Sequence, residues 1–154
     1  MLKIVEPTST SHIEGVRGLW VEYWDWLEFA PSFQDFENEL KTFPGLYASP
    51  DGCILIALYG HELAGSVALR KLNDNGCEMK RLYIRPAFRG KGIGIALAKA
   101  IVEEARKRRY AFMRLDTLPA MKEAISIYRS LNFEEIGPYV DDPVPDAKYF
   151  ELKL

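Results

Sequence analysis

The sequence predicts one α/β (α+β) domain spanning residues 1–154, in which a mixed sheet carries helices over its faces. Three observations support this fold class. Segments with apolar residues at helical spacing are interspersed with short β-rich runs. Short turn signals join the β-rich runs between residues 53 and 84 into hairpins, which are antiparallel. A long helical segment then connects two further β-rich runs, and such a connection predicts a right-handed parallel crossover.

The first third of the chain predicts one strand and two helices. Residues 2–5 alternate weakly and are expected to form a strand, followed by a cap cluster at residues 8–11. Residues 12–29 are expected to form a helix, because its apolar positions fall at helical spacing: Ile13, Val16, Leu19, Trp20, Tyr23, Trp24 and Leu27. After a break at Pro31 and Ser32, a second helix is expected to end before Pro44; its apolar residues are Phe33, Phe36 and Leu40.

The rest of the chain alternates strands, turns and helices. Strands are expected at residues 53–59, 62–69, 77–84, 111–116, 133–136 and 148–154, and helices at residues 93–109 and 119–131. The parallel crossover joins strand 77–84 through helix 93–109 to strand 111–116. The element order is therefore β-α-α-β-β-β-α-β-α-β-β.

Composition argues against several classes of function. The chain has 20 basic and 22 acidic residues, so we expect no nucleic-acid partner bound through a bulk basic surface. The basic residues 106–109 suit a helix C-terminus instead. Cys53, Cys77 and the two histidines lack metal-ligand spacing, so no metal site is expected. No apolar run reaches the roughly 18 residues of a spanning helix. The start reads as a strand without a signal peptide, so we expect a cytoplasmic protein with reduced cysteines and no membrane partner.

The run from Arg89 to Gly94 is the most informative stretch of the chain. It has three glycines, follows a strand and opens into a helix whose first N–H groups are unpaired. These features predict a phosphate or pyrophosphate site. A P-loop requires Gly-Lys-Ser/Thr, but Lys91 is followed by Gly92. A dinucleotide fingerprint requires a third glycine where this chain has Ile95 or Leu97. A glycine-rich turn without a ligand is the alternative.

Arg89, Gly92 and Gly94 match the pattern Arg/Gln-x-x-Gly-x-Gly/Ala, preceded by the segment 82–86, Leu-Tyr-Ile-Arg-Pro. These motifs resemble the pyrophosphate loop of the GNAT superfamily of acetyl-CoA-dependent N-acetyltransferases, and the resemblance extends over residues 78–133. It implies a mostly antiparallel sheet splayed between its fourth and fifth strands. It also implies acetyl-CoA as co-substrate, with its pyrophosphate held by the backbone of Arg89, Gly90, Lys91, Gly92, Ile93, Gly94 and Ile95.

The resemblance further implies a role for the strand before the loop. The backbone of Leu82 and Ile84 would pair with the pantetheine arm, and an N–H group within Leu82, Tyr83 and Ile84 would polarise the acetyl carbonyl. Two residues depart from the family pattern. Met121 stands where many relatives carry an asparagine that touches the CoA arm. Asn132 replaces a glycine, which is a mild change because asparagine tolerates the left-handed conformation.

Two catalytic residues are expected from the same resemblance. The run 124–133 resembles the family's Ala-x-x-x-Tyr-x-x-x-Gly-Phe, which implies that Tyr128 protonates the departing CoA thiolate; otherwise Tyr128 is a core aromatic. Glu78 stands eleven residues before the loop, the offset of the general base in histone-acetylating relatives. This implies that Glu78 accepts the amine proton; otherwise it is an exposed strand-end glutamate or one that orders water. Asp116 and Tyr139 are weaker candidates for accepting the amine proton.

The acceptor pocket implied by the fold is built by the first two helices, their connection and the loop before the last strand. These regions contain aromatic and acidic residues that suit an amine with an apolar or cationic body, although packing and solvation account for most of them. They are Trp20, Tyr23, Trp24, Trp26, Phe29, Phe33, Phe36, Tyr47, Tyr139, Glu22, Asp25, Glu28, Asp35, Asp141 and Asp142.

These observations together predict an enzyme. We expect an N-acetyltransferase that moves an acetyl group directly, in a ternary complex, to a primary amine of a small molecule, peptide or protein. The alternative is a non-catalytic acetyl-CoA-binding sensor or interaction module. A homodimer is compatible with both the enzyme and the sensor. The sequence does not identify the amine.

Overall fold

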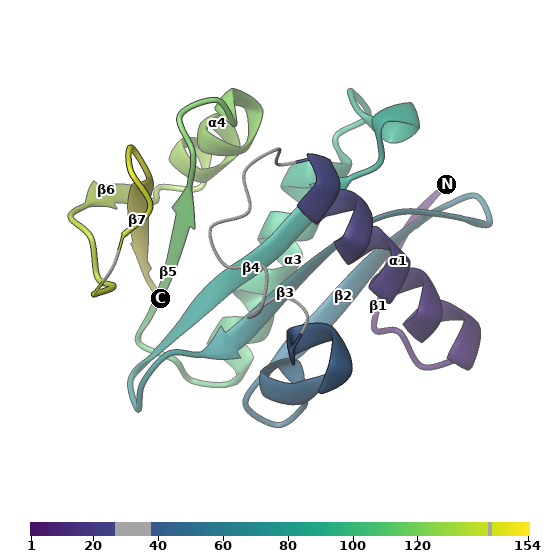
Figure 1. The fold of residues 1–154 in the computed structure, drawn as a ribbon, viewed down its shortest axis with the longest axis horizontal. Coiled ribbons are helices and arrows are strands. Elements are labelled where there is room, and N and C mark those ends of the chain that lie inside the picture. The colour runs from purple at the N-terminus through teal and green to yellow at the C-terminus, as the bar shows by residue number, and fades with distance from the viewer. Residues whose placement is uncertain (27–37, 142) are drawn as a thin grey trace.

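A computed structural model describes residues 1–26, 38–141 and 143–154 of the chain, and a seven-stranded sheet forms its centre (Figure 1). The strand order is β1-β2-β3-β4-β5-β7-β6. The strands are β1 (Leu2–Val5), β2 (Cys53–Tyr59), β3 (Glu62–Lys71), β4 (Gly76–Ile84), β5 (Phe112–Thr117), β6 (Glu134–Ile136) and β7 (Lys148–Lys153). All neighbouring pairs are antiparallel except β4 and β5, which are parallel. This confirms the predicted mixed, mostly antiparallel sheet.

The sheet opens between its two parallel strands. Only Gly76 to Glu78 of β4 pair with Phe112 to Arg114 of β5, although β4 continues to Ile84. Beyond Glu78 the two strands diverge, as Figure 1 shows. Within this divergent part Arg81 has a φ of 61°, and the β3–β4 register shifts between Ser66 and Ala68. Such a bulge bends a strand and re-aims its side chains, so the predicted splay is present and begins next to a bulge.

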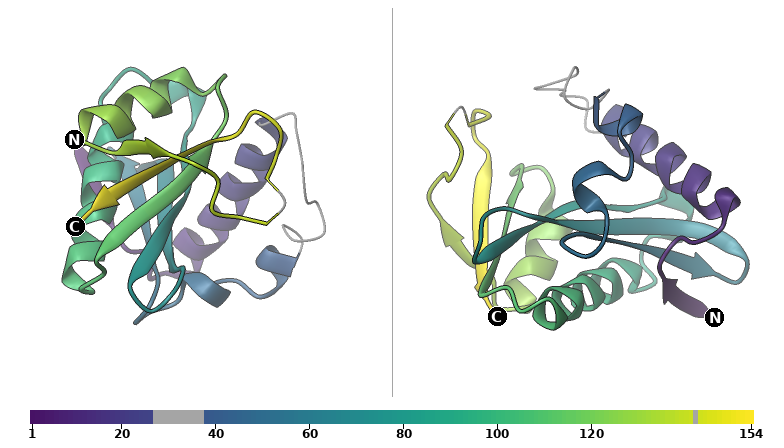
Figure 2. Two further views of the ribbon diagram at one scale, coloured as in Figure 1. Left: turned by 90° about the vertical axis from the view of Figure 1, so that its left-hand side faces the viewer. Right: turned by 90° about the horizontal axis from the view of Figure 1, so that it is seen from below.

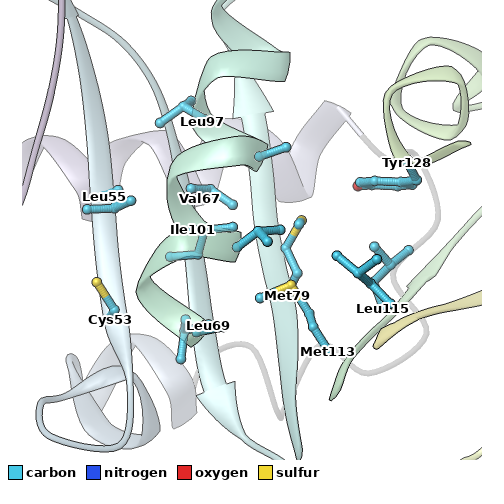
Figure 3. Close-up of a cluster of buried hydrophobic side chains, with 14 of the residues drawn as sticks. Cys53, Leu55, Val67, Leu69, Met79, Leu97, Ile101, Met113, Leu115 and Tyr128 are labelled. Carbon is cyan, nitrogen blue, oxygen red and sulfur yellow. The ribbon is translucent and has the colours of Figure 1, made fainter. Parts of the chain in front are cut away.

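Helices cover both faces of the sheet (Figure 2). Helices α3 (Ile93–Lys107) and α4 (Lys122–Ser130) lie on one face, where Leu97 and Ile101 pack on Val67, Leu69 and Met79 (Figure 3). Helix α1 (Thr10–Trp26) lies on the other face and buries Val16, Leu19 and Trp20 against β2 and β3. This two-sided burial explains why β2 and β3 are nearly continuous apolar runs.

Element boundaries differ from the sequence-based expectation by a few residues. Helix α3 ends at Lys107 because Arg109 adopts a left-handed φ of 63°. Helix α4 begins at Lys122 because residues 118–121 form a turn, in which the Met121 N–H donates to the Leu118 carbonyl. The expected helix end at Phe29, and Phe33 and Phe36 of the second helix, lie outside the described residues; residues 38–41 are helical. Among the helices described, none combines the length and the apolar character needed to cross a bilayer.

Candidate active site

Two adjoining cavities lie at the divergence of β4 and β5. The first, the loop groove, has a volume of about 670 Å³ and lies between β4, the glycine loop and α4. Its lining is Trp26, Leu82, Tyr83, Ile84, Phe88, Arg89, Gly90, Gly92, Ile93, Gly94, Ile95, Ala120, Met121, Lys122, Glu123, Ala124, Ser126, Ile127 and Ser130. The second, the splay cavity, has a volume of about 490 Å³ and lies on the other side of the opening. Leu82 and Met121 line both cavities, so the two cavities adjoin at these residues.

The glycine loop and the first turn of α3 line one part of the loop groove. Gly90 and Gly92 have φ values of 80° and 77°, which residues with a side chain adopt only with strain. A Cβ at either position would have nothing within 4 Å, so conformation and not crowding requires glycine there. Gly92 caps α3, and Ala96 is the first residue whose N–H returns to the Gly92 carbonyl. The amides of Ile93 to Ile95 therefore precede the helical ladder and lie at the positive end of the dipole, which favours an anion.

Gly94 has a different reason to be glycine. Its ideal Cβ would lie 3.0 Å from Ile127 Cδ1, so the first turn of α3 and helix α4 approach each other closely at this point. Since Ile127 precedes Tyr128, this contact fixes the distance between the loop and the candidate acid. The groove thus has the amides at the start of α3 at one end and the β4 opening at the other, an arrangement that would suit a long ligand with a phosphate group.

The two basic residues of the loop lie in different places. Arg89 Nε donates a hydrogen bond of 2.9 Å to the Ile84 carbonyl, and its guanidinium lies over the rings of Trp26 and Tyr83. Lys91 is absent from the lining of the groove, and its ammonium lies 5.3 Å from the centre of the Tyr59 ring. Arg89 therefore supplies positive charge inside the loop groove, whereas Lys91 supplies it outside.

One edge of β4 is available to a ligand in the groove. Tyr83 and Ile84 pair with Ser66 and Gly65 of β3 on one side, while β5 has diverged on the other. An extended ligand can add to such an edge in the manner of a strand. The Ile84 carbonyl already accepts the Arg89 side chain, so Leu82, which reaches both cavities, is the better placed of the two expected backbone partners.

Tyr128 projects from α4 toward the opening. It is 5% exposed and lines the splay cavity; Figure 3 shows its ring beside Leu115, with the hydroxyl directed away from α4. The ring packs on Phe133 and Phe150, with centroids 5.8 and 6.1 Å away. Within the described chain its hydroxyl has no hydrogen-bond partner. Burial, followed by the nearby Tyr23 and Asp116, raises the pKa of Tyr128 above its ordinary value, so the hydroxyl stays protonated.

Glu78 is buried beside Arg70 of the splay cavity, without lining the cavity itself, and is held by two partners. It is 3% exposed, so it is not an exposed strand-end residue. Arg70 donates from Nε and Nη2 to Glu78 Oε1, both at 2.9 Å, and the Tyr139 hydroxyl donates to Oε2 at 2.5 Å. Burial and the neighbouring Glu78 raise the pKa of Tyr139 above its ordinary value, which keeps Tyr139 a donor. Glu78 does not line the cavity, whereas Asp116 does, with Lys80 Nζ at 3.5 Å.

The walls of the splay cavity come from segments that lie far apart in the sequence. They are α1, residues 38–47, strands β3 to β5, the turn 118–121, α4 and the loop before β7. Glu39 joins two of these segments, because Oε1 accepts the Tyr47 hydroxyl at 2.6 Å and Oε2 accepts Arg81 at 2.5 and 3.0 Å. Burial raises the pKa of Tyr23, on the α1 wall, to about 12, so this hydroxyl is also neutral. The described wall of the cavity thus carries neutral hydroxyls and ion pairs.

Some expected acceptor residues line this cavity and others do not. Tyr23, Trp24 and Tyr47 do so, whereas Trp20 is fully buried in the core and Trp26 lines the loop groove. The acids Glu22, Asp25 and Asp141 are absent from the cavity lining. Phe29, Phe33, Phe36, Glu28, Asp35 and Asp142 lie outside the described residues.

The sequence reading missed three basic residues of the cavity wall. Arg70, Lys80 and Arg81 lie on β3 and β4 and line the splay cavity. A signal was present for two of them, since Lys80 and Arg81 stand within a strand that is largely apolar apart from Glu78.

One group of candidate metal ligands occurs in the described part of the chain, away from both cavities. Glu6, Cys53 and Glu104 bring their ligand atoms within 4.8 Å of one another. Lys107 and Arg108 already pair with Glu104, each at 3.0 Å. Cationic partners at the same carboxylate oppose a bound cation, so this group offers a poor metal site.

Comparison with known proteins gives a match to one family model and likeness to several proteins. The model of the acetyltransferase (GNAT) family matches residues 15–133, which include the glycine loop and α4. An uncharacterized N-acetyltransferase of Schizosaccharomyces pombe is 38% identical over 125 residues, which are 80% of this chain and 77% of that protein. Among solved structures, an acetyltransferase from Streptococcus agalactiae has a TM-score of 0.82 at 20% identity, covering 99% of this chain and 98% of that one. The protein yncA of Salmonella typhimurium, solved with its cofactor acetyl-CoA, has a TM-score of 0.76 at 18% identity, covering 99% and 94%.

Proposed function

This chain belongs to the GNAT family of acetyltransferases, and on that premise we propose that it transfers an acetyl group from acetyl-CoA to a primary amine by direct attack in a ternary complex. The acceptor is a small molecule, a peptide or a protein. The observation that carries the proposal is the junction of the two cavities at Leu82 and Met121, beside Tyr128. A ligand held by the glycine loop would bring its far end to this junction, where an amine in the splay cavity meets it.

The loop groove would hold acetyl-CoA, which supplies the thioester. The amides of Ile93 to Ile95 and the Arg89 guanidinium would bind its pyrophosphate, and the backbone of Leu82 and its neighbours Tyr83 and Ile84 would receive the arm. The groove suits this ligand because Gly90 and Gly92 leave open space above the loop. The structure of yncA with acetyl-CoA, which has the same fold, supports this choice.

Tyr128 would assist the departing sulfur. The amine nitrogen forms a bond to the acetyl carbon, the carbon–sulfur bond breaks, and negative charge develops on sulfur. The Tyr128 hydroxyl has no competing partner within the described residues and stays protonated, so it can donate to this sulfur. The result is the free thiol of CoA and an N-acetylated amine.

Glu78 would receive the amine proton. Because its carboxylate lies behind the cavity wall, the proton would pass through the Tyr139 hydroxyl or a water molecule. Asp116 lines the cavity and is the rival acceptor. The pair Glu78→Gln and Asp116→Asn separates the two. If Glu78 is the base, only Glu78→Gln abolishes the acidic limb of the pH–rate profile; loss of that limb in Asp116→Asn alone would transfer the role to Asp116.

A screen of amines with detection of released thiol tests the proposed function. Acetyl-CoA binding is measured beside it by calorimetry. Binding together with amine-dependent thiol release supports the enzyme, and intersecting initial-velocity lines support the ternary complex. Binding without release from any amine would favour the sensor, and absence of binding would reject both. The proposal includes a cytoplasmic location; a homodimer is tested by the mass of the protein in solution.

A further inference from the structure

The described wall of the splay cavity carries more positive than negative groups. Its cations are Arg70, Lys80 and Arg81, and its carboxylates are Glu39 and Asp116. The β3–β4 register pairs Ala68 with Lys80 and Arg70 with Glu78. Directly paired residues share a face of the sheet, so Arg70 and Lys80 are diagonal neighbours on the cavity face, about 7–8 Å apart.

Each cation of the wall has a carboxylate partner, but Arg70 and Lys80 are not saturated by theirs. Both oxygens of Glu39 accept hydrogen bonds, from Tyr47 and from Arg81. Arg70 is held by Glu78, its cross-strand neighbour on the same face, which does not itself line the cavity; these hydrogen bonds engage Nε and Nη2 of a five-donor group. The Lys80–Asp116 pair is 3.5 Å long, beyond the ordinary length of a charged hydrogen bond. Arg70 and Lys80 therefore retain donors for a ligand in the cavity.

We propose, on the basis of the proposed function, that the acceptor is a small amino acid whose carboxylate is bound by Lys80 and Arg70. Its amino group lies at the junction, beside Leu82, Tyr128 and Asp116. Lys80 and Leu82 are two residues apart along β4, which is about 6–7 Å. A small amino acid together with the Lys80 side chain bridges that distance. A carboxylate on Lys80 also replaces Asp116 as its partner, leaving Asp116 to the amino group.

Other acceptor classes fit the same wall less well. A polyamine places its second ammonium beside the cations of β3 and β4, where like charges repel. A neutral amine leaves the donors of Arg70 and Lys80 without a partner in a site from which the ligand has displaced water. Lys80 and Arg70 are therefore specificity-determining residues, and the expected discrimination is against amines without the carboxylate.

Matched amines test this assignment. β-Alanine, glycine and aspartate are compared with β-alaninamide, glycinamide and putrescine by thiol release, with acetyl-CoA saturating. We expect kcat/KM at least tenfold higher for β-alanine and glycine than for their amides, and higher for aspartate than for putrescine. Lys80→Met should lower kcat/KM for the acids by about tenfold or more, chiefly through KM, and change it less than threefold for the amides. The control Lys107→Met, at an exposed helix position far along the chain, should change neither.

Two further measurements keep the test decisive. Lys80→Arg preserves the charge and should therefore preserve the preference for acids. With the unaltered protein, KM for the acids should rise with ionic strength, while KM for the amides stays constant. Calorimetry should give Lys80→Met the same affinity for acetyl-CoA as the unaltered protein, which shows that it is folded. Equal or faster acetylation of amides or putrescine would overturn the assignment while leaving the N-acetyltransferase in place. Absence of both acetyl-CoA binding and thiol release would overturn the proposed function, and this assignment with it.

Discussion

Replacing Tyr128 by phenylalanine removes one hydroxyl and preserves the packing around it. The ring contacts with Phe133 and Phe150 remain, and no hydrogen bond within the described residues is lost. Removing a buried hydroxyl without a partner costs little, so we expect the free energy of unfolding to change by less than about 1 kcal/mol. The effect of Tyr128→Phe on turnover can therefore be read without a correction for unfolding.

The expected effect on catalysis is much larger. Loss of a positioned acid typically lowers the rate by about 10²–10⁴-fold. Because burial already raises the pKa of Tyr128 and makes it a weak acid, we take the lower end, about 100-fold in kcat. That corresponds to about 2.7 kcal/mol of transition-state stabilisation. The acetyl-CoA affinity should stay within twofold, because Tyr128 does not line the loop groove.

Stopped-flow detection of free thiol gives kcat, and calorimetry gives the affinity for acetyl-CoA. Tyr149→Phe is the matched control, since this tyrosine is also buried and its hydroxyl forms no hydrogen bond in the described part of the chain. It should retain the full rate. A Tyr128→Phe enzyme within threefold of the unaltered rate would refute the role of Tyr128 as acid, whatever the stability of the variant.

Three further outcomes are expected. Gly92→Ala should lower the free energy of unfolding by about 1 kcal/mol and weaken acetyl-CoA binding, because φ at this position is 77°. The control Gly137→Ala, which also has open space but no positive φ, should do neither. Equal effects of the two substitutions in a thermal melt and in calorimetry would contradict this reasoning. Tyr139→Phe should lower the free energy of unfolding in urea by about 2 kcal/mol, since it removes a hydrogen bond to a charged group, and an unchanged midpoint would argue against that bond. Burial raises the pKa of Cys53 and of Cys77 from 9.0 to about 12, so the neutral thiol is favoured in the folded state. The contribution of the two neutral thiols to stability is complete below pH 9 and is lost as pH rises toward 12, because the thiols ionise first in the unfolded state. From pH 8 to pH 10 each thiol should lower the free energy of unfolding by up to about 1.4 kcal/mol. Cys77→Ala should reduce the fall of the urea midpoint with pH, and a pH-independent midpoint would exclude the effect.

Much of the fold could be predicted because it depends on local patterns. Strand β2 and the start of α3 fall at the expected residues, since apolar runs and glycines act over a few positions. Where the boundary was wrong, a backbone detail decided it, as at Arg109 with its left-handed φ. The expected cationic or apolar character of the amine rested on the aromatic and acidic residues of α1 and the late loop. That reading omitted the basic residues of β3 and β4, which face the cavity.

The sequence by itself determined the order of the elements and predicted an anion site at the glycine loop, because both depend on the spacing of nearby residues. Tyr128 as a candidate acid came from the resemblance of residues 124–133 to the family motif. Only the tertiary structure decided which charges meet. Arg70 reaches Glu78 through strand register, and Tyr139 reaches the same carboxylate from a loop 61 residues away. Register and loop placement are set by burial of the whole sheet between α1 and α3, which no short stretch of sequence specifies. The chemistry of the acceptor wall follows from that packing.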